Sequence, residues 1–361
     1  MIVGLIGLGL SGKTTIFNAV TRGNVEVSSF QSQKGAFNRG RVLVPDERID
    51  WLTELESSKK TVYAEVEYID VAGLSGDKDS SVENEIPAVL RECDALAHVV
   101  RGFENDEVLH PKGSINIKRD IETLDDELVF ADLLLIEKRI DRVERQAKMI
   151  KDDKIKHEYE VLKKVKDALE ANQPLRTVEM TPDELKTIRG FQFLSQKPML
   201  VIINVGEDQI GDIDKITAEF AYVREKAQTD LAVVCGKIEM ELAQLSDDDR
   251  KSFMGDLGIT QSALDLVIKK SYDLLGLISF LTAGEKETRA WTVRKGSTAP
   301  VAAGVIHADF ERGFIRAEIV AYNDLKRHGS NAEAKKHGLV RLEGKSYIMQ
   351  DGDVVIFRFN V

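Results

Sequence analysis

The segment Gly7–Thr14 constrains this chain more than any other, because its sequence, GLGLSGKT, matches the pattern GxxxxGK[ST] in full. In that pattern the glycines let backbone N–H groups turn toward a phosphate. The segment follows an apolar run, Met1–Leu5, that predicts a buried strand, and it opens a helix predicted over Thr14–Thr21. The helix N-terminus adds positive potential at the same place. A strand, this loop and a helix in succession therefore predict a phosphate-binding loop in an α/β domain.

Residues of this loop have separate expected roles. We expect Lys13 to reach the β- and γ-phosphates of a nucleotide and the Thr14 hydroxyl to bind Mg²⁺. The other loop residues expected to contact the nucleotide are Gly7, Gly9, Leu10, Ser11, Gly12 and Thr15.

The segment Asp70–Gly73, with the sequence DVAG, ends a second apolar strand predicted over Ala64–Asp70. A carboxylate at this point suits outer-shell contact with Mg²⁺, and the Gly73 N–H suits contact with a γ-phosphate. An ordinary turn is the alternative interpretation of these four letters. Leu74 follows where many GTPases have a glutamine that orients water, so hydrolysis is expected to be slow or to depend on another group.

The segment 204–207, with the sequence NVGE, follows a strand predicted over Val201–Ile203. Many GTPases have Asn-Lys-x-Asp here, and the Asp accepts two hydrogen bonds from guanine. Val205 replaces that Lys and Glu207 replaces that Asp, and the longer carboxylate misplaces the guanine contact. Together with Asn204, Glu207 and Val205 therefore disfavour the binding of guanine. The amino group of adenine can instead donate to nearby backbone carbonyl groups or side chains. An ordinary loop is again the alternative.

From Asp120 onward the periodicity changes from sheet to helix. Apolar residues recur at spacings of three and four, first at Ile136, Ile140, Val143, Ala147 and Ile150, and then at Val161, Val165, Ala168 and Leu169. The polar stretch Lys151–Lys156 separates the two sets. This pattern predicts a helical hairpin, a small coiled coil, and one long surface helix is the alternative.

Three domains follow from these patterns. Residues 1–117 and 198–278 form the predicted P-loop domain with a mostly parallel sheet, residues 118–197 the inserted helical coiled-coil domain, and residues 279–361 a small β-rich domain. The last prediction depends on short alternating segments, such as Arg289–Val293 and Val354–Phe359, and on the turn signal Asp351-Gly352.

Composition limits the partners. The net charge of −11 excludes a general nucleic-acid coat, but residues 279–361 contain 13 Lys or Arg and 10 Asp or Glu, a local charge of +3 that permits RNA contact. The two cysteines, Cys93 and Cys235, imply no disulfide framework. No apolar run reaches the roughly 20 residues that span a bilayer. We therefore expect a cytoplasmic protein that has no membrane partner and recognises no DNA sequence.

At the level of whole segments, the chain resembles the YchF/Obg-like ATPase family of P-loop NTPases. The resemblance spans almost the whole sequence and is carried by VPDERIDWL at 44–52, YIDVAGL at 68–74, HVVRGFE at 98–104, residues 120–128, NVGE at 204–207, KIEMELAQL at 237–245 and nearly all of 275–361. It implies a sheet domain, an inserted coiled coil and a C-terminal TGS domain, which is β-grasp-like. It also implies a preference for ATP over GTP, and association with ribosomes.

Several positions depart from the family pattern. Leu10 stands where the family has the Asn that assists a monovalent cation. The first switch, Ser28–Gly40, has no Thr for Mg²⁺, so Ser32 is the candidate hydroxyl, and the second switch is replaced by GDKDSSVE at 76–83. The resemblance therefore supports nucleotide binding by this chain more strongly than it supports nucleotide hydrolysis.

The family has a histidine at the position of His110, which lies in the predicted polar loop 104–114. A histidine there can orient or deprotonate water near neutral pH, so His110 is the candidate catalytic residue. The alternative is an ordinary solvated loop histidine.

Three functions remain open from the sequence. The first is a Mg²⁺-dependent ATPase with slow turnover whose nucleotide state changes its docking on a ribosome. The second is a nucleotide-binding, ribosome-associated module with negligible turnover, and the third is an Obg-type GTPase, which the NVGE loop argues against. Candidate contacts to ribosomal RNA are Lys151, Lys154 and Lys156 at the hairpin tip and Lys295, Arg312, Arg316 and Lys345 in the last domain.

Overall fold

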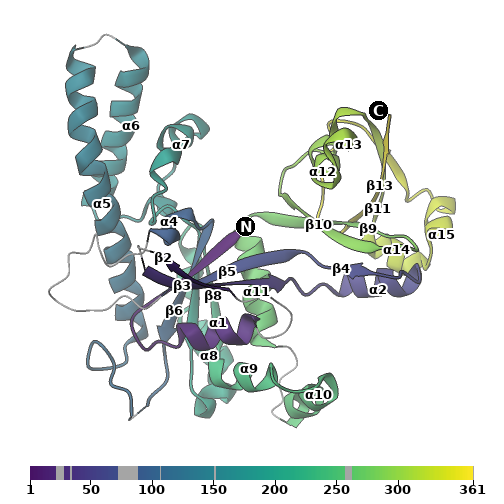
Figure 1. The fold of residues 1–361 in the computed structure, drawn as a ribbon, viewed down its shortest axis with the longest axis horizontal. Coiled ribbons are helices and arrows are strands. Elements are labelled where there is room, and N and C mark those ends of the chain that lie inside the picture. The colour runs from purple at the N-terminus through teal and green to yellow at the C-terminus, as the bar shows by residue number, and fades with distance from the viewer. Residues whose placement is uncertain are drawn as a thin grey trace. The chain divides into compact units, whose positions relative to one another are not determined.

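The computed structural model describes residues 1–21, 28–32, 35–71, 88–105, 107–149, 152–256 and 262–360 (Figure 1). The chain divides into two compact units, the first made of Met1–Val42 and Glu67–Leu274, the second of Leu43–Val66 and Leu275–Val361. The sequence pattern predicts that residues 43–66 belong to the P-loop domain. The structure places them in the second unit because β4 (Thr61–Val62) pairs in parallel with β10 (Thr288–Arg294).

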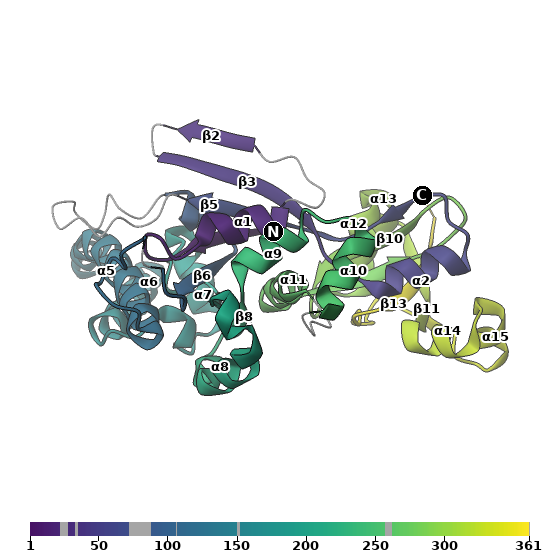
Figure 2. The same cartoon turned by 90° about the horizontal axis from the view of Figure 1, so that it is seen from below.

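The first unit contains a seven-stranded sheet in the order β2-β3-β5-β1-β6-β7-β8. Its strands are β1 (Ile2–Ile6), β2 (Ser28–Ser32), β3 (Gly35–Leu43), β5 (Glu65–Val71), β6 (Ala95–Arg101), β7 (Met199–Asn204) and β8 (Thr229–Val234). β1 pairs in parallel with β5 and β6, and β6, β7 and β8 continue the parallel order. β2 and β3 form an antiparallel ribbon at one edge (Figure 2).

Burial explains why these strands are almost continuously apolar. Every residue of β6 and of β7 is buried, as expected for strands of a parallel sheet that is covered on both faces. The helices of this unit are α1 (Lys13–Thr21), α4 (Val89–Glu92), α5 (Ile117–Met149), α6 (Asp153–Glu170), α7 (Pro182–Ile188), α8 (Ile213–Glu219), α9 (Gly236–Leu242), α10 (Asp247–Asp256) and α11 (Ala263–Leu274). Short 3₁₀ turns lie at Leu175–Thr177, Arg189–Phe191, Glu207–Asp212 and Ala221–Glu225. None of the helices in the described part of the chain is long and apolar enough to cross a membrane.

The parallel order brings four functional segments to one edge of the sheet. The carboxyl ends of β1, β5, β6 and β7 lead into the glycine loop, the DVAG segment, the loop that carries His110 and the NVGE loop. Ligands of open α/β sheets bind at this edge, because the loops there converge from different strands.

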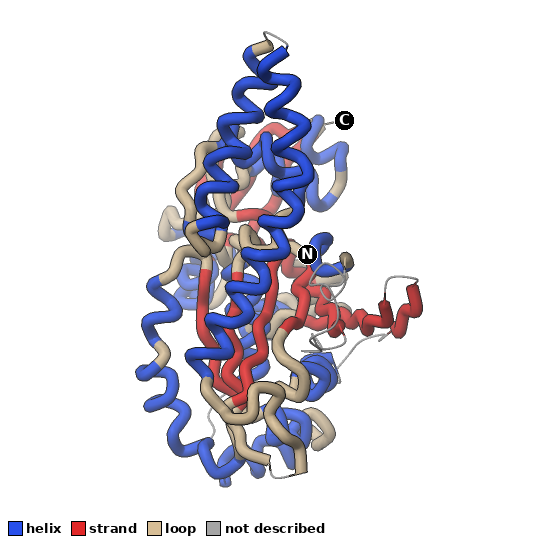
Figure 3. Tube along the Cα trace, turned by 90° about the vertical axis from the view of Figure 1, so that its left-hand side faces the viewer, coloured by secondary structure: helices blue, strands red, loops and turns tan. Residues whose placement is uncertain are grey.

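The helical segment is a hairpin of two helices and not one long helix (Figure 3). α5 and α6 pack through a hydrophobic cluster that includes Ile136, Val143, Val161 and Val165. Asp152 begins α6 as its N-cap, since its side chain accepts a hydrogen bond from the Lys154 N–H. Of the residues predicted for the hairpin, Ile150 and Lys151 lie outside the described residues.

A buried carboxylate fixes α5 to the sheet. Asp132 has no exposed surface and accepts hydrogen bonds from the backbone N–H groups of Leu194 (3.0 Å) and Ser195 (2.7 Å). Arg91, in α4, also donates to it at 3.0 Å. Burial raises the pKa of Asp132, and these three donors oppose that rise. Asp132 therefore joins α5, α4 and the segment before β7.

The second unit contains a six-stranded sheet in the order β12-β11-β13-β9-β10-β4. Besides β4 and β10, its strands are β9 (Leu277–Thr282), β11 (Phe314–Ala321), β12 (Arg341–Glu343) and β13 (Asp353–Phe359). Its helices are α2 (Glu47–Leu55), α12 (Ala299–Ile306), α13 (Ala308–Arg312), α14 (Tyr322–His328) and α15 (Asn331–Lys336). The predicted turn at Asp351-Gly352 precedes β13, and Gly352 has a φ of 81°, which favours glycine.

We expect Asp132→Ala to lower the free energy of unfolding of the first unit by about 3–5 kcal/mol, because it leaves two buried N–H groups and a guanidinium without their acceptor. Glu137→Ala, an exposed carboxylate on the same helix, is the matched control and should change stability by less than about 0.5 kcal/mol. Chemical denaturation followed by circular dichroism measures both. Equal stability of the two variants would refute this role of Asp132.

Candidate functional site

The glycine loop connects β1 to α1 and approaches other backbone so closely that two positions require glycine. A Cβ atom on Gly7 would lie 2.3 Å from the carbonyl oxygen of Val99, and one on Gly12 would lie 2.2 Å from Nδ2 of Asn204. Both residues also have positive φ, 145° and 92°. Leu10 adopts a φ of 63° and is 58% exposed, so the residue that replaces the family's Asn points into solvent at the loop's turn.

Lys13 is buried at the start of α1. Its Nζ donates to the carbonyl oxygens of Gly7 (3.0 Å) and Leu8 (2.8 Å), so the side chain folds back over its own loop. Burial lowers the pKa of Lys13 to about 8, and the charge of Asp70 opposes that shift. A buried ammonium group of this kind gains most from an anion that enters the loop, because an added negative charge offsets its desolvation.

Thr14 and Asp70, which the sequence separately suggests for Mg²⁺, lie side by side. The Thr14 hydroxyl donates to Oδ2 of Asp70 at 2.9 Å, although 56 residues separate them. Burial raises the pKa of Asp70, while the Thr14 hydroxyl and Lys13 oppose the rise. A hydroxyl and a carboxylate side by side are oxygen donors of the kind that Mg²⁺ prefers, so the pair fits this ion.

Two predicted site residues cannot be placed. Gly73 lies outside the described residues, and so does the side chain of Ser32, whose backbone belongs to β2. Their contacts with nucleotide and Mg²⁺ stay predictions. Thr15, also predicted, is partly exposed in the first turn of α1.

Asn204, at the end of β7, connects two loops. Its Nδ2 donates to the Ser11 carbonyl oxygen at 3.1 Å, and its Oδ1 accepts from the Gly236 N–H at 2.9 Å. The side chain is buried, and both of its polar atoms are hydrogen-bonded to backbone groups. Val205 is buried in the hydrophobic core, and its N–H donates to the carbonyl oxygen of Val234. The structure therefore gives both residues a role in shaping the loop.

Glu207 forms an ion pair that the sequence analysis did not identify. Its carboxylate accepts from Nζ of Lys237, at the start of α9, and both side chains are substantially exposed. The resemblance included the segment that begins at Lys237, but nothing in it indicated that the lysine contacts Glu207. The carboxylate that stands where GTPases read guanine thus already has a cationic partner.

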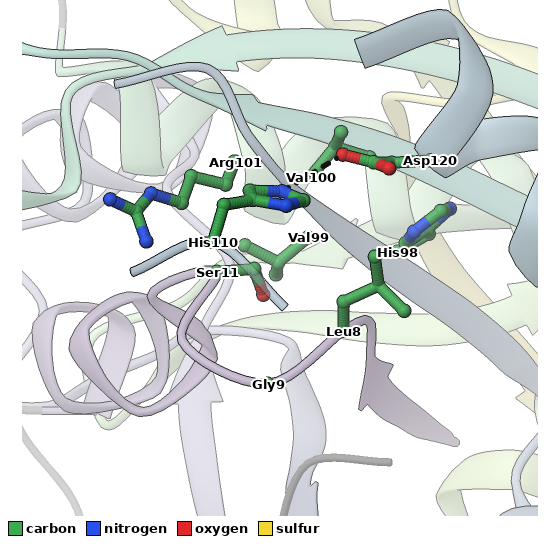
Figure 4. A pocket seen from close by; sticks show the side chains of 9 residues that line it. All are labelled: Leu8, Gly9, Ser11, His98, Val99, Val100, Arg101, His110 and Asp120. Carbon is green, nitrogen blue, oxygen red and sulfur yellow. Dashed lines mark ion pairs between the residues drawn. The ribbon is translucent and has the colours of Figure 1, made fainter. Parts of the chain in front are cut away.

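His110 lies in the loop between β6 and α5, and its side chain is only 5% exposed (Figure 4). Its Nε2 is 3.1 Å from Oδ2 of Asp120, and its Nδ1 accepts from the Lys112 N–H at 3.1 Å. Burial lowers the pKa of His110, and Asp120 opposes that shift. His110 is therefore not the solvated loop histidine of the alternative interpretation.

The surroundings of His110 include the glycine loop. The small pocket in Figure 4 is lined by Leu8, Gly9, Ser11, His98, Val99, Val100, Arg101, His110 and Asp120. His98 is buried, and burial lowers its pKa to about 3, so it is a neutral core histidine. His110 and the phosphate loop thus share one site.

Arg101, at the end of β6, holds the loop that carries His110. Its guanidinium donates to the carbonyl oxygens of Phe103 (3.1 Å) and Val108 (2.9 Å) and lies 4.7 Å from the centre of the Phe103 ring. The residue is only 3% exposed. Sequence reasoning missed Arg101, because an arginine at the end of an apolar strand does not reveal that it turns back to bind the following loop.

Comparisons with known proteins match this chain to the same family along almost its whole length. The family model described as "50S ribosome-binding GTPase" matches residues 2–205, and the YchF C-terminal model, described as "Protein of unknown function (DUF933)", matches residues 277–360. The chain is 46% identical to the "Ribosome-binding ATPase YchF" of Bacillus subtilis and 39% identical to that of Escherichia coli O157:H7, each over 99% of both chains.

A solved structure of the YchF GTPase from Schizosaccharomyces pombe is 28% identical and has a TM-score of 0.82, over 99% of this chain and 97% of that one. The resemblance seen in the sequence is confirmed, and so is the predicted fold class. From the glycine loop to the last strand, this chain belongs to the YchF family of P-loop nucleotide-binding proteins.

Proposed function

We propose that this protein is a Mg²⁺-dependent ATPase that hydrolyses ATP slowly and associates with ribosomes. The observation that carries the proposal is the glycine loop with a buried Lys13 beside the Thr14–Asp70 pair. The relatives named ribosome-binding ATPase support it, since they align with this chain along its full length. Ribosomes as the partner favour a cytoplasmic location.

Binding of the nucleotide requires Lys13 to change partners. In this proposal its ammonium group leaves the carbonyl oxygens of Gly7 and Leu8 and binds the β- and γ-phosphates. Thr14 and Asp70 would hold Mg²⁺. The ion supplies positive charge that offsets the charge developing on the phosphates.

The Glu207–Lys237 pair supports a preference for ATP. A guanine-reading carboxylate accepts hydrogen bonds from the base, whereas the Glu207 carboxylate is already paired with Lys237. This observation argues against the Obg-type GTPase. The family resemblance supports the same preference.

His110 is the proposed catalytic residue, which orients or deprotonates the attacking water. Its place beside the glycine loop supports this role. Slow turnover follows from Leu74, which offers no group to orient water and lies outside the described residues. The ribosome-associated module with negligible turnover remains the second candidate, favoured by the altered switch segments.

The charge of the second unit refines the docking hypothesis. Residues 43–66 contain 3 Lys or Arg and 6 Asp or Glu, so they cancel the charge of +3 on residues 279–361. The net charge of this unit therefore does not favour RNA, and docking must depend on local clusters. The clearest cluster lies on α14 and α15, which expose Lys326, Arg327, Lys335 and Lys336.

We expect ATP to bind at least about 10-fold more tightly than GTP, a difference of about 1.4 kcal/mol. The reason is that Glu207 is paired with Lys237 and Val205 is buried, so neither residue reads guanine. Calorimetric titration of the purified protein with each nucleotide and Mg²⁺ measures the difference. Equal affinities, or tighter binding of GTP, would contradict the proposal.

We expect Lys13→Ala to abolish tight ATP binding while the protein stays folded, because the variant removes the ammonium group that faces the phosphates. Lys118→Ala, an exposed lysine at the start of α5, is the matched control and should bind ATP as the wild type does. The same titration, with circular dichroism to check folding, measures both. Near-wild-type affinity of the Lys13 variant would show that this loop is not the phosphate site.

We expect ribosome docking to depend on the cluster on α14 and α15. Lys326→Glu with Lys335→Glu should weaken co-sedimentation with ribosomes, and raising the salt concentration should weaken it further, because phosphate contacts release counterions. Lys295→Glu with Arg316→Glu makes the same charge change elsewhere in the unit and is the matched control. If only the second variant loses docking, the contact lies at Lys295 and Arg316, as the sequence analysis proposed.

A further inference from the structure

Both ring nitrogens of His110 have neighbours, Nδ1 in the loop between β6 and α5 and Nε2 on α5. Nδ1 accepts from the Lys112 N–H, so the proton of the neutral ring resides on Nε2, which lies 3.1 Å from Oδ2 of Asp120. Figure 4 shows the ring turned toward the Asp120 carboxylate. The two contacts together select one tautomer of the imidazole.

Asp120 is itself firmly held in the first turn of α5. The residue is 2% exposed, and its Oδ1 accepts from Nε of Arg119 at 2.8 Å. Its backbone N–H donates to the carbonyl oxygen of Asn116. A buried carboxylate with this support keeps its position when a neighbouring loop moves.

The other contact of His110 is in a more accessible place. The Lys112 N–H belongs to a turn closed by a hydrogen bond from the Gly113 N–H to the His110 carbonyl oxygen, and Pro111, Lys112 and Gly113 are all exposed. A hydrogen bond at an exposed turn is replaced by water at little cost, whereas separating the buried histidine and carboxylate costs more. Movement of this loop therefore frees Nδ1 before it frees Nε2.

We propose that Asp120 is the positioning partner of His110, holding the Nε2–H so that Nδ1 is the atom that accepts a proton from the attacking water. This inference rests on the proposed role of His110. The water oxygen bonds to the γ-phosphorus while its proton passes to Nδ1. The bond from phosphorus to the β,γ-bridging oxygen breaks, and ADP leaves with that electron pair. Asp120 stabilises the resulting imidazolium, which then releases its proton to solvent.

The charges that face His110 agree with this arrangement. Arg101 from β6 and Arg119 from α5 lower its pKa, as burial does, and Asp120 is the anion that raises it. His98, also from β6, stays neutral, and Lys13 is turned to its own loop. Without Asp120, the imidazolium would have two cationic neighbours and no carboxylate among the residues that line this pocket.

The test compares Asp120→Asn, His110→Ala and the double variant in single-turnover ATP hydrolysis across pH 5 to 9, with ATP affinity measured separately. Asn has the same shape as Asp, but its amide can donate to Nε2 and select the wrong tautomer. We expect the plateau rate to fall at least about 10-fold, within the range of general-base effects, while ATP affinity is unchanged. The acid limb of the profile should shift to lower pH by about one unit, because an anion is lost. Asp120→Glu should recover part of the rate.

The double variant separates a positioning role from a structural one. If Asp120 acts through His110, adding Asp120→Asn to His110→Ala causes no further loss. A further loss in that background, or an unshifted pH profile, would overturn the inference. A faster rate in Asp120→Asn would also overturn it, because Asp120 would then restrain His110. Full activity of His110→Ala would refute the proposed role of His110 itself.

Discussion

Asn204 is the side chain on which the geometry of the site depends. By accepting from Gly236 and donating to Ser11, one amide sets the distance between the glycine loop after β1, the end of β7 and the start of α9. Gly12 is required next to this amide, because a Cβ atom there would lie 2.2 Å from Nδ2 of Asn204. The phosphate loop is therefore held in place by a side chain of the NVGE loop.

What the sequence revealed was mostly local. The glycine loop and the buried strands could be predicted because each depends on a short pattern with a known geometric consequence. The helical hairpin was predicted for the same reason, since its apolar positions repeat within each helix.

The rest depends on contacts between distant or irregular segments. β4 has only two residues, and no pattern indicates that Val62 pairs with Arg289. The sequence also did not predict the partners of charged side chains. No pattern indicates that Arg101 binds the following loop or that Lys237 pairs with Glu207. His110 was found only through the family resemblance, and its burial against Asp120 was visible only in the structure.

The divided origin of the second unit has a consequence for how the chain folds during synthesis. Arg48 donates to Asp351 across 303 residues, and Ser58 contacts Thr288 across 230. The segment 43–66 leaves the translating ribosome early, but β13, which begins just after Asp351, emerges after every other strand that the structure describes. Ile49 and Leu52 form the apolar face of α2 and are buried in the folded protein. This face therefore stays exposed until the later strands of the unit have been synthesised. Such long-range closure makes this unit slow to form, and a chain terminated early would expose α2 with nothing to cover it.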